Sequence, residues 1–372
     1  MAEETVPFYG HVRQYHNLKE EIDQAIHDVL ESGKYTLGPR GEKFEKELVD
    51  YTGMKTAIGL NSGTDAIWLV LLALGIGRGD EVITTSNTFF ATAEAVWLIG
   101  ATPVFVDIEP KTRNIDVTKI EEKITPRTKA IIPVHLFGQP ADMPAIREIA
   151  DKHNLAVIED CAQAIGARGD TFKIGELSDA VCLSFITAKN LGTFGDGGGV
   201  VTNRTDIVEP IQKMRNHGSI KRSHHSVGWN SRLDEIHAAV LSVKLKYIDQ
   251  WNDLRIARAK DYAEFMKGCK MILPYTKPGY RHVFHLYVVE SEDRDGLQAY
   301  LKDQGIIALT NYPVAIHQQE GFPFGAGDPN PHLPNTEWHA ARVLSLPLYP
   351  ELTREEAKIV ADACVAWEKT QA

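Results

Sequence analysis

One lysine, Lys189, lies between a run of apolar residues and a glycine-rich segment. The surrounding sequence, from Leu183 to Val201, is LSFITAKNLGTFGDGGGVV. Burial of an ammonium group is unfavourable, so a lysine in this setting can be kept neutral enough to attack an aldehyde. A solvated loop lysine is the more common role, but it would leave Ser184 and the glycines from Gly192 to Gly199 unexplained. The pattern therefore favours a lysine that binds an aldehyde, with the glycines folded around a planar ligand.

Two neighbouring carboxylates, Glu159 and Asp160, follow the apolar run LAVI. A carboxylate at the end of a buried strand has to be paired with a positive group or protonated. Asp160 would find such a partner in the protonated ring nitrogen of a bound cofactor. The alternative is an ion pair within the protein or a cap for the next helix, which is the more common role of a single such residue.

The segment NSGTDAI lies between the strand-like run TAIGL and an apolar helix-like run. Gly63 would let the backbone approach a ligand closely, and the amides of Thr64 and Asp65 at a helix start attract an anion. This pattern indicates a phosphate site, provided that the Asp65 carboxylate points away from it. Simple capping of the helix by Ser62 or Thr64 is the alternative.

An aromatic residue, Phe89, follows the strand-like run EVITT. Its ring would stack on a flat heteroaromatic ring, although filling the core is the more common role of a phenylalanine. Together the four features supply an aldehyde acceptor, a partner for a pyridinium nitrogen, a phosphate site and a stacking face. Those are the requirements of pyridoxal 5'-phosphate (PLP), which acts as an electron sink for carbanion chemistry.

Short apolar runs alternate with longer runs of helical period between residues 56 and 185. This alternation predicts an α/β fold with a mostly parallel central sheet that is flanked by helices on both faces. Ligands bind at the carboxyl ends of the strands in such sheets, and the four features above lie just beyond predicted strands.

The pattern changes in the last third of the chain. A long helix is predicted over residues 233–268, followed by a strand at 282–290, a helix at 295–305 and a closing helix from Thr353. These elements predict a smaller α+β unit. We therefore expect a large PLP-binding domain, residues 1–250, and a small C-terminal domain, residues 251–372.

Composition argues against several classes of protein. The chain has 372 residues and a formal net charge of -10, so its overall field repels a nucleic acid backbone. No apolar run approaches the roughly 18 residues that a membrane helix needs. The four cysteines form no CxxC pair and the histidines lack metal-site spacing, so neither disulfides nor a metal is expected. The first residues lack the plan of a secretory signal, which predicts a cytoplasmic protein.

Ordered segments along nearly the whole chain resemble the sugar aminotransferases of the DegT/DnrJ/EryC1/StrS family. The matching segments are GPRGEKFEKELVDYTG, NSGTDAI, TFFATAEAV, IPVHLFGQPADM, IEDCAQAIGA, SFITAKNLGTFGDGGGVV, RNHG, GWNSRLDEIHAAVL and VLSLPLYPELT. No single segment is specific for the family, but the occurrence of so many segments in the same order is. The resemblance implies the PLP-dependent transferase fold of type I.

The resemblance also implies roles for individual residues. Lys189 would hold the cofactor covalently and act in catalysis together with Asp160, which would pair with the pyridine nitrogen. The other cofactor contacts implied are Gly63, Thr64 and Ser184 at the phosphate, Phe89 on the ring face, Gln163 near the ring hydroxyl, and Asn230. Asn230 would reach the phosphate of the neighbouring subunit, so the active site would be shared across a homodimer.

Departures from the family pattern lie where the substrate is expected. Thr187 stands where the family often has a proline, Asn311 where it often has a histidine, and Tyr349 where a histidine or phenylalanine is common. Tyr312 and His317 keep the family pattern and are the predicted substrate residues. The departures bear on the identity of the sugar rather than on the cofactor chemistry.

The resemblance predicts an aminotransferase that moves nitrogen from an amino acid, with L-glutamate as the expected donor, to a keto group of a nucleotide-linked deoxysugar. Two other enzyme activities stay open: dehydration of a keto-deoxysugar, and transamination of a free sugar or cyclitol. Relatives that only dehydrate usually lack the lysine, so Lys189 disfavours the first. A PLP-binding regulator that turns over no substrate is disfavoured by the acidic charge and the lack of an added DNA-binding domain.

Overall fold

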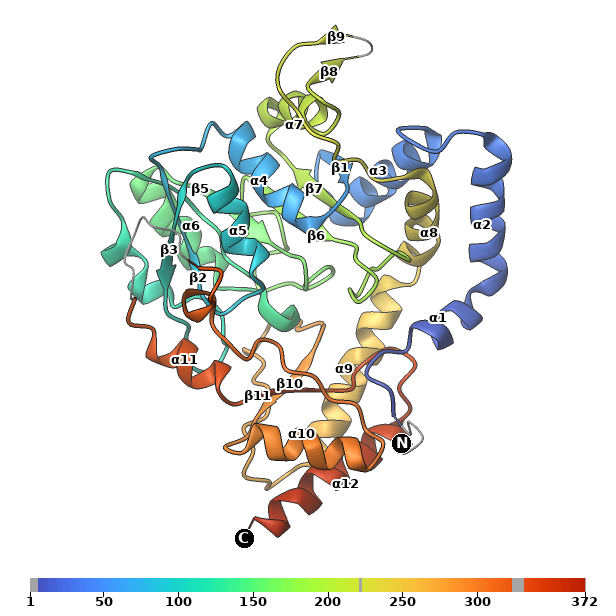
Figure 1. The fold of residues 1–372 in the computed structure, drawn as a ribbon, viewed down its shortest axis with the longest axis vertical. Coiled ribbons are helices and arrows are strands. Elements are labelled where there is room, and N and C mark those ends of the chain that lie inside the picture. Colours follow the sequence, from blue (N-terminus) through green and yellow to red (C-terminus); the bar gives the residue numbers. More distant parts are fainter. Residues whose placement is uncertain (1–5, 221–222, 323–330, 372) are drawn as a thin grey trace.

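The computed structural model of the protein describes residues 6–220, 223–322 and 331–371 (Figure 1). Within these ranges a seven-stranded sheet has the strand order β1-β7-β6-β5-β4-β2-β3. Its strands are β1 (Thr56–Leu60), β2 (Glu81–Thr85), β3 (Thr102–Val106), β4 (Thr128–Ile131), β5 (Ala156–Asp160), β6 (Ala180–Ser184) and β7 (Gly198–Thr202).

The sheet is mostly parallel, as predicted. Among its seven strands, β7 alone runs antiparallel to its neighbours, which are β1 and β6. The connection from β6 to β7, residues 185–197, contains no helix. A parallel return usually runs through a helix, and this helix-free connection brings the chain back antiparallel. The segment that we expected to fold around a ligand therefore continues into a strand at Gly198.

Helices cover both faces of the sheet, and alternate strand residues point to them. Leu183 packs in one cluster with Phe44 of α3 and Leu241 of α8, whereas its neighbour Cys182 packs in another with Leu69 of α4. This alternation follows from the two-residue period of a strand. The helices of these layers are α3 (Pro39–Thr52), α4 (Gly63–Ala73), α5 (Ala91–Leu98), α6 (Met143–His153), α7 (Val208–Met214) and α8 (Glu235–Leu245).

The amino-terminal part consists of α1 (His11–Asn17) and α2 (Lys19–Ser32), which lie along one side of the molecule in Figure 1. α2 is capped by Gly33, whose φ of 64° is a left-handed conformation that glycine adopts without strain. Its buried face carries Ile22 and Val29.

The long helix predicted over residues 233–268 is wrong in one respect, because it is two helices. α8 ends at Leu245 and α9 (Ile248–Phe265) follows after a short break. At the break, Lys246 Nζ and Tyr247 Oη both donate to the Glu21 carboxylate of α2, at 3.0 and 2.5 Å. The tertiary contact with Glu21 thus coincides with a break that the continuous apolar pattern did not reveal.

A smaller unit lies below the sheet in Figure 1. Its antiparallel pair β10–β11 packs with α9, α10 and α12 around a separate core that includes Tyr262, Leu297 and Val360. The elements are β10 (Tyr287–Glu290), α10 (Arg294–Asp303), α11 (Pro334–Ala340), β11 (Val343–Leu346) and α12 (Arg354–Thr370). The proposed domain division after residue 250 falls inside α9, and it stays a prediction.

The remaining elements are short. A hairpin of β8 (Ser219–Ile220) and β9 (Ser223–His224) projects from the top of the molecule in Figure 1. Single 3-10 turns are η1 (Val117–Lys119), η2 (Glu121–Lys123), η3 (Leu136–Gly138), η4 (Thr205–Ile207) and η5 (Ile316–Gln318).

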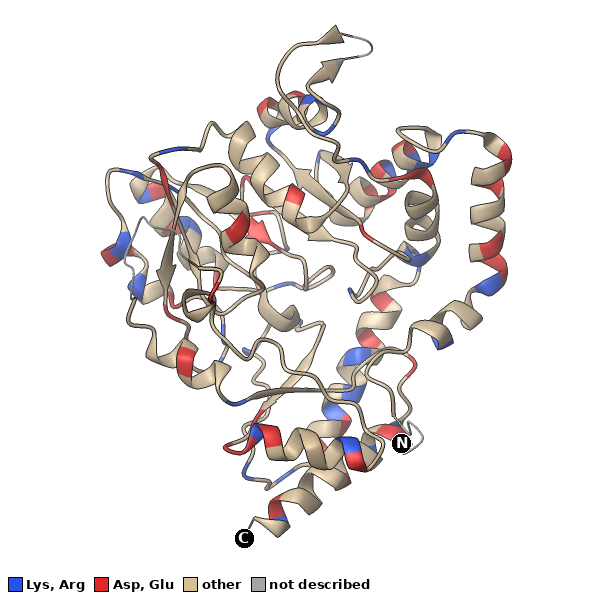
Figure 2. Cartoon of the chain, in the orientation of Figure 1, with Lys and Arg blue, Asp and Glu red and all other residues tan. Residues whose placement is uncertain are grey.

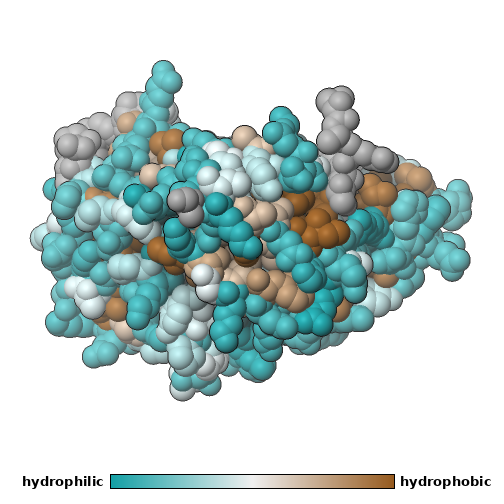
Figure 3. Space-filling view, turned by 90° about the horizontal axis from the view of Figure 1, so that it is seen from below, coloured by the Kyte–Doolittle hydropathy of each residue, from teal (hydrophilic) through white to brown (hydrophobic). Residues whose placement is uncertain are grey.

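The surface carries charges of both signs. Figure 2 shows basic and acidic residues interspersed over the helices in this view. The face seen from below is mainly hydrophilic, with apolar residues in separate patches (Figure 3). In the three described ranges, no helix has the length and apolar character that crossing a bilayer requires.

Candidate active site

Lys189 lies in the connection between β6 and β7, which we call the lysine loop (residues 185–197). Its backbone N–H donates to the carbonyl of Ile186 at 2.9 Å, which closes a tight turn. The side chain is half-buried. Burial lowers the pKa of the Lys189 ammonium to about 8, and the negative charge of Asp160 opposes part of this shift. About a tenth of the amine is therefore neutral, and nucleophilic, at pH 7.

Asp160 is the last residue of β5 and is buried. Its Oδ2 accepts a hydrogen bond from the Thr92 hydroxyl of α5 at 2.8 Å, and its Oδ1 accepts one from the backbone N–H of Ala162 at 3.2 Å. The Thr92 hydroxyl also contacts the Thr88 hydroxyl at 3.1 Å. Two neutral donors orient this carboxylate without neutralising it, so its charge can act on Lys189 or on a bound cation.

Glu159, the preceding residue, has a separate set of partners. Its Oε2 lies 2.7 Å from Nε2 of His135, and its Oε1 accepts hydrogen bonds from Gly175 N–H at 2.8 Å and Ser178 Oγ at 2.5 Å. Since His135 Nδ1 accepts from the Ala141 N–H, the His135 proton is on Nε2 and is donated to Glu159. Glu159 therefore has the internal, structural role that the sequence left open for both carboxylates.

The start of α4 packs directly against the end of β6. A Cβ added at Gly63 would lie 2.8 Å from Cβ of Ser184, closer than side chains pack. Ser62 caps the helix by accepting the Asp65 N–H at 3.1 Å. Helix geometry leaves the N–H groups of Gly63 and Thr64 without intrahelical partners, and these groups attract an anion. Gly63, Thr64 and Ser184 are thus brought together as predicted, and Ser62 does cap the helix.

Asp65 points away from this anion site, as the phosphate interpretation requires. Its Oδ1 accepts from Trp68 Nε1 at 3.1 Å, and its Oδ2 accepts from the Ser231 hydroxyl at 2.7 Å. On the other side, a Cβ at Gly198 would lie 2.1 Å from the carbonyl carbon of Ser62. The glycine at position 198 is therefore explained by the close approach of β7 to the backbone before Gly63.

Phe89 follows β2 and is 56% exposed. Its ring centroid lies 5.8 Å from that of Tyr312, at an angle of 42°. Gln163 links this pair to the sheet, because its Nε2 donates to Tyr312 Oη at 3.0 Å and its Oε1 accepts from Phe137 N–H at 2.7 Å. Burial, then the nearby Asp160 charge, raises the pKa of the Tyr312 phenol, which stays neutral.

The two remaining predicted site residues, His317 and Asn230, lie in different environments. The His317 side chain is 4% exposed, with Nδ1 2.8 Å from Ser86 Oγ and Nε2 3.2 Å from Glu337 Oε1. Both ring nitrogens are thus used within the protein, so His317 fixes η5 against the end of β2. Asn230 is exposed next to the β8–β9 hairpin, and its backbone bridges to Asn216.

Sequence reasoning missed Thr92 and the hydrogen bond that it makes to Asp160. Thr92 lies only three residues after Phe89, on the helix that follows the same strand. A polar residue on the first turn of a mostly apolar helix was the available signal, because such a residue lies at the carboxyl end of the sheet.

A partly desolvated lysine, a buried carboxylate whose charge acts on it, and an anion-binding helix start lie together at the carboxyl ends of the parallel strands. This arrangement is the candidate active site, and it is suited to amine chemistry. The chain belongs to the DegT/DnrJ/EryC1/StrS aminotransferase family, whose model matches residues 16–365. The protein is therefore an aminotransferase, and the predicted family is confirmed.

Several curated proteins resemble the chain over almost its full length. A Streptomyces venezuelae protein named dTDP-3-amino-3,4,6-trideoxy-alpha-D-glucose transaminase is 46% identical over 97% of this chain and 96% of its own. The UDP-N-acetyl-3-dehydro-alpha-D-glucosamine 3-aminotransferase of Acidithiobacillus ferrooxidans is 46% identical over 92% and 93%. A Geobacillus stearothermophilus protein named pleiotropic regulatory protein is 45% identical over 96% and 97%.

One solved structure with a similar fold contains a bound cofactor. Ntda from Bacillus subtilis, crystallised with bound cofactor PMP, matches with a TM-score of 0.92 and 36% identity, over 99% of this chain and 86% of its own. The predicted type I transferase fold is confirmed by such matches.

Proposed function

We propose that this aminotransferase uses PLP, bound covalently through Lys189, to move an amino group from an amino acid to a keto group of a nucleotide-linked deoxysugar. L-glutamate is the expected donor. The observation that carries the proposal is the Lys189 amine, whose pKa is lowered to about 8 beside the buried Asp160. The names of two relatives, a dTDP-sugar transaminase and a UDP-sugar aminotransferase, support the class of acceptor.

The residues present fit PLP. The start of α4 is a cradle that a Cβ at Gly63 would fill, and it offers two N–H groups and the Thr64 and Ser184 hydroxyls to a phosphate. Phe89 offers an exposed ring face. The bound PMP of the Bacillus subtilis relative supports PLP as the cofactor, because PMP is the amine form of PLP.

PLP, when bound, supplies an electron sink that stabilises negative charge on a substrate carbon. The protein has to hold and move protons around it. Lys189 Nζ is suited to take a proton from the substrate carbon and return it, because its pKa lies near the working pH. Asp160, oriented by Thr92, would hold a proton on the ring nitrogen by charge.

The proposal includes a homodimer with shared active sites. Asn230 is exposed beside a projecting hairpin, where a partner chain could be reached, and its role at the partner's phosphate is inferred from family resemblance. On the substrate side, Tyr312 lies next to Phe89 and is proposed to contact the sugar. His317 is proposed to act there too, by holding η5 in place.

We also propose a cytoplasmic location, without membrane or nucleic acid partners. The four cysteines are free in the structure, which is in line with a reducing compartment. The acidic net charge of -10 disfavours a nucleic acid partner.

The test combines the purified enzyme, PLP and L-glutamate with a panel of dTDP- and UDP-linked keto-sugars, free keto-sugars and cyclitol ketones. We expect an aminated nucleotide sugar, identified by mass and NMR, and no product with Lys189→Ala. A product that has lost water without gaining nitrogen would instead identify a dehydratase, and amination of only a free sugar or cyclitol would overturn the nucleotide-linked acceptor. A protein whose cofactor absorbance does not respond to glutamate would fit a regulator.

A further inference from the structure

The lysine loop is a compact structure with little freedom of its own. Besides the turn at Lys189, the N–H of Thr193 donates to the carbonyl of Phe185 at 2.8 Å. At Gly192 a Cβ would lie 2.5 Å from the carbonyl oxygen of Thr187. The loop therefore closes tightly on itself, and its position depends on what holds it as a unit.

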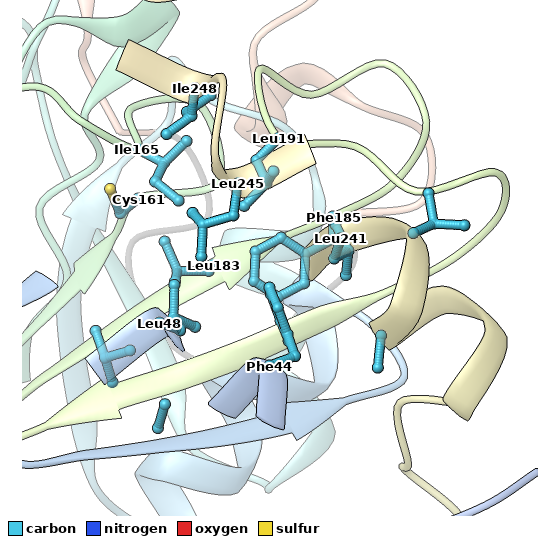
Figure 4. Close-up of a cluster of buried hydrophobic side chains, with 14 of the residues drawn as sticks. Phe44, Leu48, Cys161, Ile165, Leu183, Phe185, Leu191, Leu241, Leu245 and Ile248 are labelled. Atoms are coloured by element: carbon cyan, nitrogen blue, oxygen red, sulfur yellow. The ribbon is translucent and has the colours of Figure 1, made fainter. Parts of the chain in front are cut away.

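One anchor of the loop is apolar and comes from the large domain. Leu191 is fully buried and belongs to the core cluster shown in Figure 4, where it lies near Ile248 and Leu245. Next to it, the buried Lys244 of α8 donates to the carbonyl of Gly192 at 2.7 Å. These contacts hold the part of the loop that follows Lys189 and Asn190.

The second anchor is polar and acts on Asn190, the residue directly after Lys189. Asn190 Nδ2 donates to Asn252 Oδ1 of α9 at 2.8 Å and is 3.3 Å from the carbonyl of Val283. Asn252 Nδ2 in turn donates to the carbonyl of Ile165 at 2.9 Å, which fixes the orientation of that amide. Asn190 Oδ1 is consequently the acceptor atom, and it faces Nδ1 of His285 at 3.1 Å.

This network determines the proton of His285. Because Asn190 Oδ1 can only accept, the His285 proton must be on Nδ1. His285, Asn190 and Asn252 are all buried. Burial, followed by the charges of Lys189 and Arg255, holds the pKa of the His285 imidazole well below its ordinary value. His285 is therefore a neutral donor that adds no positive charge near Lys189.

We infer that His285 is a positioning residue for the reaction, and that its Nδ1–H, through Asn190, sets the place of the Lys189 amine. His285 comes from the chain just before β10, in the smaller unit, whereas Lys189 and Asp160 belong to the sheet. The hydrogen bond therefore joins the smaller unit to the residue next to the catalytic lysine. The inference rests on the proposed role of Lys189.

Three substitutions separate the positioning role from simple packing. His285→Asn keeps an N–H two bonds from Cβ, as Nδ1 is, so it can still donate to Asn190. His285→Gln places its N–H three bonds from Cβ, as Nε2 is, and His285→Leu has none. A matched control is His282→Asn in the same segment, because the buried His282 accepts from the Phe284 N–H at 3.0 Å and stacks on that ring at 3.8 Å.

The measurement is the rate constant at which L-glutamate converts the cofactor absorbance of each PLP-loaded variant, together with PLP content and melting temperature. We expect His285→Gln and His285→Leu to be slowed roughly 10- to 100-fold, because a displacement of about 1 Å at a reacting group has effects of that size. His285→Asn and His282→Asn should react at close to the wild-type rate, and PLP content should be unchanged, since the phosphate cradle is not altered.

Three results would overturn the inference. They are a wild-type rate for His285→Leu, a His285→Gln variant that outperforms His285→Asn, and a His285→Asn variant as slow as His285→Leu. A His285→Leu variant with a lower melting temperature but an unchanged rate is a case of the first result. In each case the wild-type enzyme would still respond to glutamate, so the proposed function would stand. Failure of the wild-type enzyme itself would overturn both.

Discussion

Glu159 and Asp160 are adjacent on β5, yet their carboxylates bind to separate donors. Glu159 is held by His135, Gly175 and Ser178, whereas Asp160 accepts from the Thr92 hydroxyl and the Ala162 N–H. Successive strand residues point to opposite faces of a sheet, so Glu159 is bound within the fold while Asp160 lies toward the proposed active site.

This division predicts different effects of two isosteric substitutions. Asp160→Asn should lower kcat by about 10²- to 10³-fold, because it removes the charge that acts on the cofactor ring. Glu159→Gln should leave kcat close to wild type but lower the free energy of unfolding by about 1–3 kcal/mol, because a buried charge-assisted network is weakened. Steady-state kinetics and denaturant unfolding measure both. Equal kinetic losses in the two variants would contradict the assignment.

The pKa of Lys189 predicts how cofactor attachment depends on pH. Only the neutral amine attacks an aldehyde, and the amine is charged below its pKa and neutral above it. The rate at which PLP becomes attached to the cofactor-free protein should therefore rise with pH through a midpoint near 8, rather than near the ordinary value of 10.5. Stopped-flow absorbance would record this rate.

Two variants control that experiment. Lys189→Ala should show no covalent attachment at any pH. Asp160→Asn should move the midpoint below that of the wild type, because the Asp160 charge raises the Lys189 pKa against the effect of burial. A midpoint that stays near 10.5 would show that the lysine is solvated, and a midpoint that does not fall when Asp160 is neutralised would contradict the charge interaction.

The order of strands and helices in the sequence was sufficient to predict that the main candidate site residues lie at one edge of the sheet. Lys189, Asp160, Phe89 and Gly63 each follow a predicted strand, and the carboxyl ends of parallel strands meet at one edge. This rule needs only the order of the elements. The phosphate interpretation also required that the Asp65 carboxylate point away from the site. In the structure this carboxylate accepts hydrogen bonds from Trp68 and Ser231.

The contacts that refine the site could not be predicted in this way. Thr92 meets Asp160, and Asn190 meets His285, across separations of 68 and 95 residues. A local sequence pattern does not show which distant residues form such hydrogen bonds, because these pairs depend on how helices and loops pack. The break between α8 and α9, which coincides with a contact to Glu21 far away in the sequence, was missed for the same reason.

The cradle at α4 predicts a cofactor-affinity defect for Gly63→Ala. The new methyl group would lie 2.8 Å from Ser184 Cβ, and relief of this overlap must shift the helix start or Ser184. Overpacking of this kind costs about 1–3 kcal/mol, which corresponds to a roughly 10- to 100-fold higher Kd for PLP. Gly77→Ala is the control, because its methyl group would lie 3.6 Å from the nearest atom, the Ile99 carbonyl oxygen. Absorbance titration of the dialysed variants with PLP would measure the Kd of each. Equal affinities for PLP would contradict a phosphate site at Gly63.

The proposed sharing of the active site across a homodimer predicts complementation between two inactive variants. Lys189→Ala lacks the catalytic amine, and Asn230→Ala should lack the contact that the partner supplies, so each homodimer should have little activity. Dissociating and reassociating equal amounts would give heterodimers as half of all dimers. Each heterodimer would carry one site with both residues intact, so about a quarter of the wild-type activity should return. If Asn230 acted on its own subunit's site, no intact site would form and the mixture would stay as inactive as its parents. Kinetic assay before and after mixing, with size-exclusion chromatography to follow exchange, separates these outcomes.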